Sequence, residues 1–256
     1  MRIGTASALG LTVLALMSSP VTLDAQRTAP VTREASVPFK VGETLSYDVS
    51  WSAVLVAGNA TARVVENKGD AYAVVVEGRP IPMLARLYNL YYRMESLLDS
   101  GTLLSQRGTL YSEEGSDKTT GTTRFDRSGR RAYYERQAEG TAKTDLPIPP
   151  GAQDGLAAFY AIRAHAFKPG ERLTLPVADS GSMYSVQIDV EQPESVKAPV
   201  GELSAWKLTV GITDAQSQPV WKNIVLWISN DARRLPVKMQ AELPVGSFVL
   251  VLREAR

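Results

Sequence analysis

The stretch LSYDVSW (Leu45–Trp51) alternates apolar and polar side chains one residue at a time. Successive side chains of a strand point to opposite faces, so this pattern predicts a strand buried on one face only. The same alternation recurs in Asn59–Val64, Tyr184–Val190, Trp206–Val210 and Val237–Leu243. Turn residues separate these segments, and together with similar segments they predict about a dozen strands.

Two segments depart from the alternation. Asp154–His165 (DGLAAFYAIRAH) places Leu156, Phe159 and Arg163 on one stripe, and Asp154 is a favourable N-cap residue, so we predict a helix there. Pro82–Asn89 is compatible with a short helix. Long antiparallel sheets must hide their edges. We therefore predict a mainly β fold: a large curved antiparallel sheet forming a barrel or half-barrel, with one central α-helix at about 154–165 packed on it.

The N-terminal sequence predicts export. Arg2 precedes an apolar run at Ala8–Met17 and small residues, which is typical of a secretory signal peptide at about residues 1–25. Residues 26–38 lack apolar periodicity and are expected to form a disordered lead, and residues 39–256 to form a single β-rich domain. We find no later apolar run that could span a membrane. The chain has no cysteine, which predicts a periplasmic protein that is not a lipoprotein.

Composition excludes several classes of function. The 256 residues carry a formal net charge of +1 and no basic run, so nucleic-acid binding is not expected. One histidine, His165, and no cysteine cannot form a His/Cys metal site, so we predict no metal and no cofactor.

No catalytic motif is readable either. Ser204 and Lys207 match S-x-x-K, but they lie in an alternating segment, where a spacing of three puts their side chains on opposite faces. A carboxylate pair such as Glu95 and Asp99 is more simply explained by solvated positions. We predict no catalytic residues and no enzymatic activity.

Several motifs resemble the bacterial family known as domain of unknown function 3108. They are FKVGETLSYDVSW (Phe39–Trp51) with Ala57-Gly58, RMESLLD (Arg93–Asp99), RFD (Arg124–Asp126), DGLAAFYAIR (Asp154–Arg163), Ala198–Gly201, and WISNDARRLPVKM (Trp227–Met239). The resemblance covers nearly all of the chain after residue 38. It implies an exported β-rich protein with no assigned activity, and it offers no catalytic residues to carry over. Gly155-Leu156-Ala157 departs slightly from the more polar or Pro-containing helix start of relatives.

Three arginines in these motifs, Arg93, Arg124 and Arg163, have acidic neighbours in sequence. One interpretation is that they form ion pairs that tie strands to the helix. The alternative is a cluster that recognises an anionic headgroup, because guanidinium groups bind such groups bidentately.

The segment Met83–Met94 is rich in large amphipathic and flexible side chains, which adapt to irregular ligands. It could equally be a core-packing segment. Our binding hypothesis places it at the mouth of a concave apolar face. The residues we expect to contact the ligand are Met83, Leu84, Leu87, Tyr88, Tyr91, Arg93, Phe159 and Arg163.

Three functions follow, in order of preference. The first is binding of a hydrophobic or lipid-like envelope ligand in the concave face of the sheet. The second is a scaffold that binds another envelope protein through a sheet edge or exposed aromatics. A hydrolase acting on envelope glycan or lipid ranks last, because no nucleophile–base pair is readable.

Overall fold

The computed structural model describes residues 37–51, 55–66, 70–138, 140–243 and 246–256. The predicted signal peptide (1–25) and residues 26–36 of the predicted lead lie outside the described residues.

The described chain forms fourteen strands and two helices. In chain order they are β1 (Thr44–Trp51), β2 (Leu55–Glu66), β3 (Ala71–Pro80), α1 (Pro82–Ala85), β4 (Leu90–Asp99), β5 (Ser105–Glu114), β6 (Asp117–Asp126), β7 (Arg131–Gln137), β8 (Thr141–Pro147), α2 (Gly155–Arg163), β9 (Arg172–Asp179), β10 (Ser182–Ala198), β11 (Gly201–Asp214), β12 (Pro219–Ser229), β13 (Pro236–Leu243) and β14 (Gly246–Ala255).

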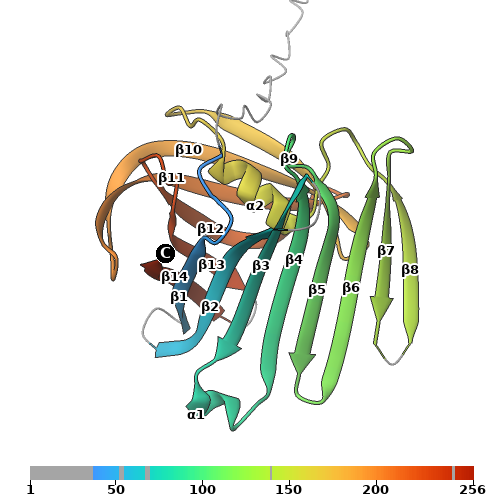
Figure 1. Cartoon of the computed structure of the whole chain (residues 1–256), viewed down its shortest axis with the longest axis horizontal. Helices are drawn as coiled ribbons and strands as arrows, with labels where there is room; N and C mark the ends of the chain where they lie inside the picture. Colours follow the sequence, from blue (N-terminus) through green and yellow to red (C-terminus); the bar gives the residue numbers. More distant parts are fainter. Residues whose placement is uncertain (1–36, 52–54, 67–69, 139, 244–245) are drawn as a thin grey trace, which may run out of the picture.

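All fourteen strands belong to one sheet in the order β8-β7-β6-β5-β4-β3-β2-β1-β14-β13-β12-β11-β10-β9. Each half of the chain is a meander of neighbouring antiparallel strands, and α2 connects the two meanders. Pairing of β1 with β14 joins the first strand to the last, for example Val49 opposite Leu250. The sheet curls around α2 without closing, because β8 and β9 remain edge strands (Figure 1). The predicted curved antiparallel sheet with one central helix is confirmed.

The alternating segments lie in strands as predicted: Leu45–Trp51 in β1, Asn59–Val64 in β2, Tyr184–Val190 in β10 and Val237–Leu243 in β13. Of the short helix predicted at Pro82–Asn89, only the single turn α1 (Pro82–Ala85) is helical. A non-helical turn follows it and leads into β4 at Leu90.

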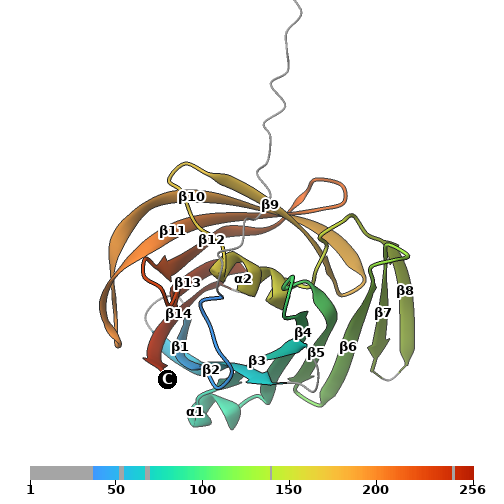
Figure 2. The same ribbon diagram turned by 45° about the horizontal axis from the view of Figure 1, so that its top comes forward.

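Helix α2 starts where the sequence predicts. Asp154 has extended backbone angles, and its side chain accepts a hydrogen bond from the Ala157 N–H at 2.9 Å, which satisfies one of the free donors of the first turn. The helix lies inside the curl of the sheet (Figure 2), where it contacts β4, β5 and β9. We call the face of the sheet on which α2 packs the concave face.

Arg163, at the C-terminal end of α2, is fully buried and paired with Glu43, which directly precedes β1. Its Nη1 lies 2.7 Å from Glu43 Oε1 and its Nη2 lies 3.2 Å from Oε2, so the pair is bidentate. Arg163 also donates to the carbonyl oxygens of Arg234 (3.1 Å) and Arg233 (3.4 Å), which lie between β12 and β13. A buried charge is tolerated only when it is paired and hydrogen-bonded, and here it ties α2 to both halves of the chain.

Apolar core residues pack against α2 from both meanders. Buried residues of β9–β12 pack against Ala158 and Ile162, whereas Val64, Val74 and Leu98 of β2–β4 belong to the cluster that contains Ala157 and Tyr160. One helix therefore fills the space between the two meanders.

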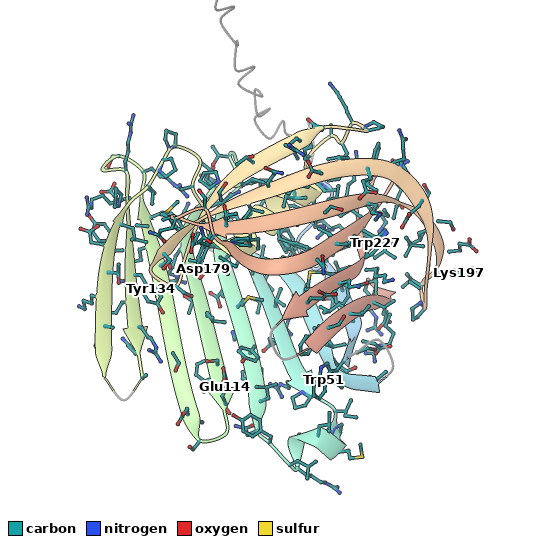
Figure 3. All side chains as sticks on the ribbon, turned by 180° about the vertical axis from the view of Figure 1, so that it is seen from behind. Trp51, Glu114, Tyr134, Asp179, Lys197 and Trp227 are labelled. Carbon is teal, nitrogen blue, oxygen red and sulfur yellow. The ribbon has the colours of Figure 1, made fainter. Side chains whose placement is uncertain are left out.

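The two edge strands approach each other at one place. A Cβ added to Gly181, in the β9–β10 turn, would lie 2.9 Å from the Tyr134 ring on β7 and 3.2 Å from Thr144 Oγ1 on β8. Figure 3 shows Tyr134 and Asp179 beside each other at this point. Ala132, Ile148 and Ala178 also form a small buried cluster here. Side-chain packing thus links β7 and β8 to the β9 end of the sheet without a continuous ladder.

Replacing one partner of the buried ion pair should be costly. Arg163→Met leaves the Glu43 carboxylate buried and unpaired, and we expect a loss of about 3–5 kcal/mol in the free energy of unfolding, measured by urea titration. Arg172→Met removes one partner of the exposed Arg172–Asp189 pair and serves as the control, with a loss of at most about 1 kcal/mol. Equal losses in the two variants would contradict the role assigned to Arg163.

Candidate functional site

A polar cluster of Ser96, Ser105, Arg127 and Asp154 lies under the start of α2. The Ser96 hydroxyl donates to Asp154 Oδ2 at 2.6 Å, and the Asp154 N–H donates to Ser105 Oγ at 3.0 Å. Arg127 donates to the carbonyl oxygens of Ser105 and Ala152. A Cβ at Gly108 would lie 2.9 Å from the Asp154 side chain, so only glycine lets β5 approach the helix start this closely. The cluster fastens α2 to β4 and β5.

Two carboxyl groups near this cluster have raised pKa values. Burial raises the pKa of Asp154 to about 6, against the hydrogen bonds from Ser96 and Ala157, which lower it. Burial also raises the pKa of Asp179. Both side chains line a cavity of about 40 Å³, large enough for a water molecule but too small for an organic substrate. The arrangement is a buried contact in which both carboxyl groups keep their protons to a higher pH than usual.

The described residues provide no metal site, since they contain no group of three or more His, Cys, Asp or Glu side chains that could hold an ion. His165 is buried, and its Nε2 lies 3.0 Å from Glu171 Oε2. Ser204 and Lys207 both lie on β11, so their spacing of three places them on opposite faces, as predicted.

The concave face continues beyond α2 along β3 and β4. Ser96 reaches α2, so Met94 and Tyr92, two and four residues before it, share its face. Tyr92 pairs with Gly78 of β3, and a Cβ added to Gly78 would meet no atom within 4 Å. Met94 is 40% exposed although it faces the inside of the curl. The concave face below α2 thus exposes apolar side chains, and Glu114 lies at its outer end, where it accepts a hydrogen bond of 2.7 Å from the Tyr92 hydroxyl.

One end of the sheet carries most of the exposed large apolar side chains. This end, which we call the open end, contains the end of β1, the start of β2, α1 and the start of β4; α2 lies at the other end (Figure 1). Figure 3 shows Trp51 and Glu114 near α1 at this end. The exposed apolar residues here are Trp51, Val56, Met83, Leu87, Tyr88 and Tyr92.

The structure divides the residues predicted to bind a ligand among three places: the open end, helix α2 and the convex face of β4. Met83, Leu84, Leu87 and Tyr88 lie on α1 and the following turn at the open end, with Leu87 80% and Met83 61% exposed. Phe159 lies on α2, partly buried against the core clusters on both sides of the helix. These groups do not form one contiguous set.

Tyr91 and Arg93 lie on the convex face, because they alternate with Tyr92 and Met94 along β4. The Tyr91 hydroxyl donates to Glu77 Oε1 at 2.6 Å, and Arg93 lies 3.1 Å from both Glu77 Oε1 and Glu95 Oε2. Arg93 therefore forms ion pairs, but they join β3 and β4 and do not tie a strand to the helix. Arg163 does tie the helix to the sheet, and its partner is Glu43 rather than Asp154 of the same motif.

Four concave-face residues were not among the predicted ligand contacts: Trp51, Gly78, Tyr92 and Met94. Tyr92 and Met94 do lie within the predicted segment Met83–Met94. A signal was present for Trp51, since it continues the odd-numbered apolar positions of Leu45–Trp51. Gly78 could not be recognised from the sequence, because its role depends on the free space around the position of a Cβ, which only the structure shows.

Fold and surface together define an open, barrel-like antiparallel β protein with a helix closing one end and an apolar surface at the other. The family model described as protein of unknown function DUF3108 matches residues 46–253, and the chain belongs to this family. The resemblance seen in the sequence motifs is thereby confirmed.

One solved structure agrees on the fold. A β-barrel-like protein of domain of unknown function DUF1849 from Brucella abortus is similar with a TM-score of 0.60 at 10% sequence identity, over 84% of this chain and 97% of that one. Two further structures are less similar. One is a "putative exported protein" from Bacteroides fragilis (TM-score 0.33, 11% identity, 86% of this chain and 97% of that one), and the other is a "putative lipoprotein" from Parabacteroides distasonis (TM-score 0.35, 9% identity, 88% of this chain and 100% of that one).

No curated protein matches the chain. Among the described residues, neither helix has the length and apolar character needed to cross a membrane.

The raised pKa of Asp154 predicts how stability depends on pH. The folded protein binds the carboxyl proton more tightly than the unfolded chain, so this group makes the fold less stable as pH rises from about 4 to about 6. Asp154→Asn keeps a capping side chain but cannot ionise. We expect the wild type to lose on the order of 3 kcal/mol relative to this variant across that range, measured by urea unfolding at each pH. Parallel stability curves for the two proteins would contradict the assignment.

Proposed function

We propose that the protein binds a lipid-like apolar ligand on the concave face below α2, and that the ligand enters through the open end. The observation that carries this proposal is the position of the exposed apolar side chains, which form a rim at the open end and continue inward along the concave face. Single exposed apolar residues are ordinary, whereas a contiguous group marks a binding surface.

The inner part of this surface suits an aliphatic chain. Met94 supplies a flexible side chain, Tyr92 an aromatic ring, and Gly78 leaves free space between them and the opposite strands. Flexible side chains next to a glycine, which has no side chain, can accommodate an irregular apolar ligand. Glu77 and Arg93 lie on the convex face, whereas the carboxylate of Glu114 bonds the Tyr92 hydroxyl at the outer end of the concave face.

The rim suits contact with a lipid surface. Leu87 and Met83 are apolar and highly exposed, Tyr88 and Trp51 are amphipathic aromatics of the kind enriched at membrane interfaces, and Arg86 lies beside them in sequence. A ligand extracted from a membrane would pass from the lipid surface to the concave face without crossing bulk water.

The proposed location is the periplasm. Support comes from the N-terminal sequence pattern of residues 1–25, which is typical of a signal peptide and lies outside the described residues. An apolar carrier or sensor in that compartment would meet envelope lipids directly.

Filling the free space at Gly78 should block binding. Gly78→Leu adds a side chain where nothing lies within 4 Å, and Gly211→Leu does the same on the convex face of β11, so both variants should fold. We expect Gly78→Leu to weaken binding of cis-parinaric acid, followed by its fluorescence, by roughly tenfold or more, equivalent to about 1.4 kcal/mol. Gly211→Leu should bind as the wild type does. Unchanged binding by a folded Gly78→Leu protein would exclude the concave face as the site.

The rim can be tested separately with vesicles of phosphatidylglycerol. The double variant Leu87→Ser/Tyr88→Ser should bind vesicles roughly tenfold less tightly in cosedimentation, because it loses apolar contact with the lipid interface. The control is Val65→Ser/Tyr133→Ser, which also removes one aliphatic and one aromatic side chain, at exposed positions (38% and 44%) away from the open end. If the two double variants bind equally well, the open end is not the lipid-facing end.

A further inference from the structure

A second cavity lies on the other side of α2 from the concave surface below it. Its volume is about 300 Å³, at the lower end of the range for small-molecule sites. Its walls come from the turn after β4, the loop that precedes α2, α2 itself and β9. Leu103, Ala161 and Leu175 are representative of its apolar lining, and no charged side chain lines it.

One of the residues that line this cavity has a buried polar atom without a partner. Gln153 lines the cavity and is 2% exposed, and its Oε1 has no hydrogen-bond partner. It is the one buried side-chain oxygen or nitrogen in this situation among the described residues. Leaving a buried acceptor unpaired costs free energy, so such an atom needs an explanation, and a bound donor is the simplest one.

The edge of β9 supplies further hydrogen-bonding groups. The Gln153 N–H donates to Pro176 O at 3.2 Å and the Ala178 N–H donates to Gln153 O at 2.9 Å, so these even-numbered positions of β9 face away from β10. Hydrogen-bonding direction alternates along an antiparallel strand, which turns the N–H and C=O of Thr174 to the same free side. Thr174 also lines the cavity.

We propose that this cavity binds a small uncharged ligand that carries an amide group next to an apolar body. The amide N–H would donate to Gln153 Oε1, and the backbone of Thr174 would offer a donor and an acceptor to the remaining polar atoms. Apolar walls exclude a charged ligand, because they offer no partner for its charge. This site shares no residue with the concave surface, so it is independent of the lipid-like ligand proposed above.

The donor requirement can be tested with two probes of nearly the same shape. N-isobutylacetamide has the N–H, whereas isobutyl acetate has an ester oxygen in its place. Titration of the wild-type protein, followed by backbone and side-chain amide NMR signals, should show shifts at Thr174 and at the Gln153 side chain. The ester should bind at least roughly fivefold more weakly, since it leaves the buried acceptor unpaired. Equal binding of the two probes, or shifts only at other residues, would overturn the proposal.

Removing the unpaired acceptor of Gln153 should change both the stability and the ligand preference of the protein. Gln153→Leu keeps the size of the side chain and removes the unpaired atom, so the ligand-free variant should melt at a higher temperature than the wild type and should no longer distinguish amide from ester. Gln187→Leu, at an exposed position of β10 opposite Thr174, is the control and should change neither property. A lower melting temperature for Gln153→Leu would show that Gln153 is needed for the fold and would overturn the proposal.

Two sources of the amide group are distinguished by two larger probes. N-acetylleucine methylamide represents a peptide, and methyl N-acetylglucosaminide represents an N-acetylated sugar. Tighter binding of either probe than of N-isobutylacetamide, with shifts at Thr174, would support the proposal and identify the source. Failure of all three amides to shift Thr174 would contradict it.

Discussion

The burial of α2 inside the sheet is the constraint on which the rest of the structure depends. A helix surrounded by protein must satisfy the free polar groups at both of its ends. At the start of α2, Asp154 accepts from the Ala157 N–H and is itself hydrogen-bonded to Ser96 and Ser105 of β4 and β5. In the last turn, Arg163 fastens the helix to Glu43 and to the carbonyl groups between β12 and β13. These partners come from both meanders, so fixing the helix also fixes the curl of the sheet.

The two ends of the sheet differ as a consequence. At the helix end, polar and charged groups are buried and paired, and apolar side chains fill the space between the meanders. At the open end α2 does not reach over the concave face (Figure 1), and among the described residues Trp51, Met83 and Tyr92 remain exposed. The same strands therefore supply a packed core at one end and an apolar surface at the other, and this asymmetry is the basis of the proposed function.

Much of this architecture was predictable, because side-chain alternation and an N-cap aspartate are local features. LSYDVSW and DGLAAFYAIR indicated β1 and α2 directly. The candidate site was harder to predict, since alternation also separates neighbours: Tyr91 and Arg93 face outward while Tyr92 and Met94 face inward. The partner of Arg163 lies 120 residues away, and the unpaired oxygen of Gln153 is visible only when every surrounding group is placed.

The proposed apolar ligand lies on the concave face between α2 and the open end. Paramagnetic broadening by stearic acid with a nitroxide near its methyl end tests this most directly, since it reports the position of the bound chain. Amide NMR signals of Gly78, Tyr92 and Met94 should be the most strongly broadened, with Gly211 and the strand Thr141–Pro147 unaffected. Broadening centred on the convex face, or uniform weak broadening throughout the protein, would contradict the account.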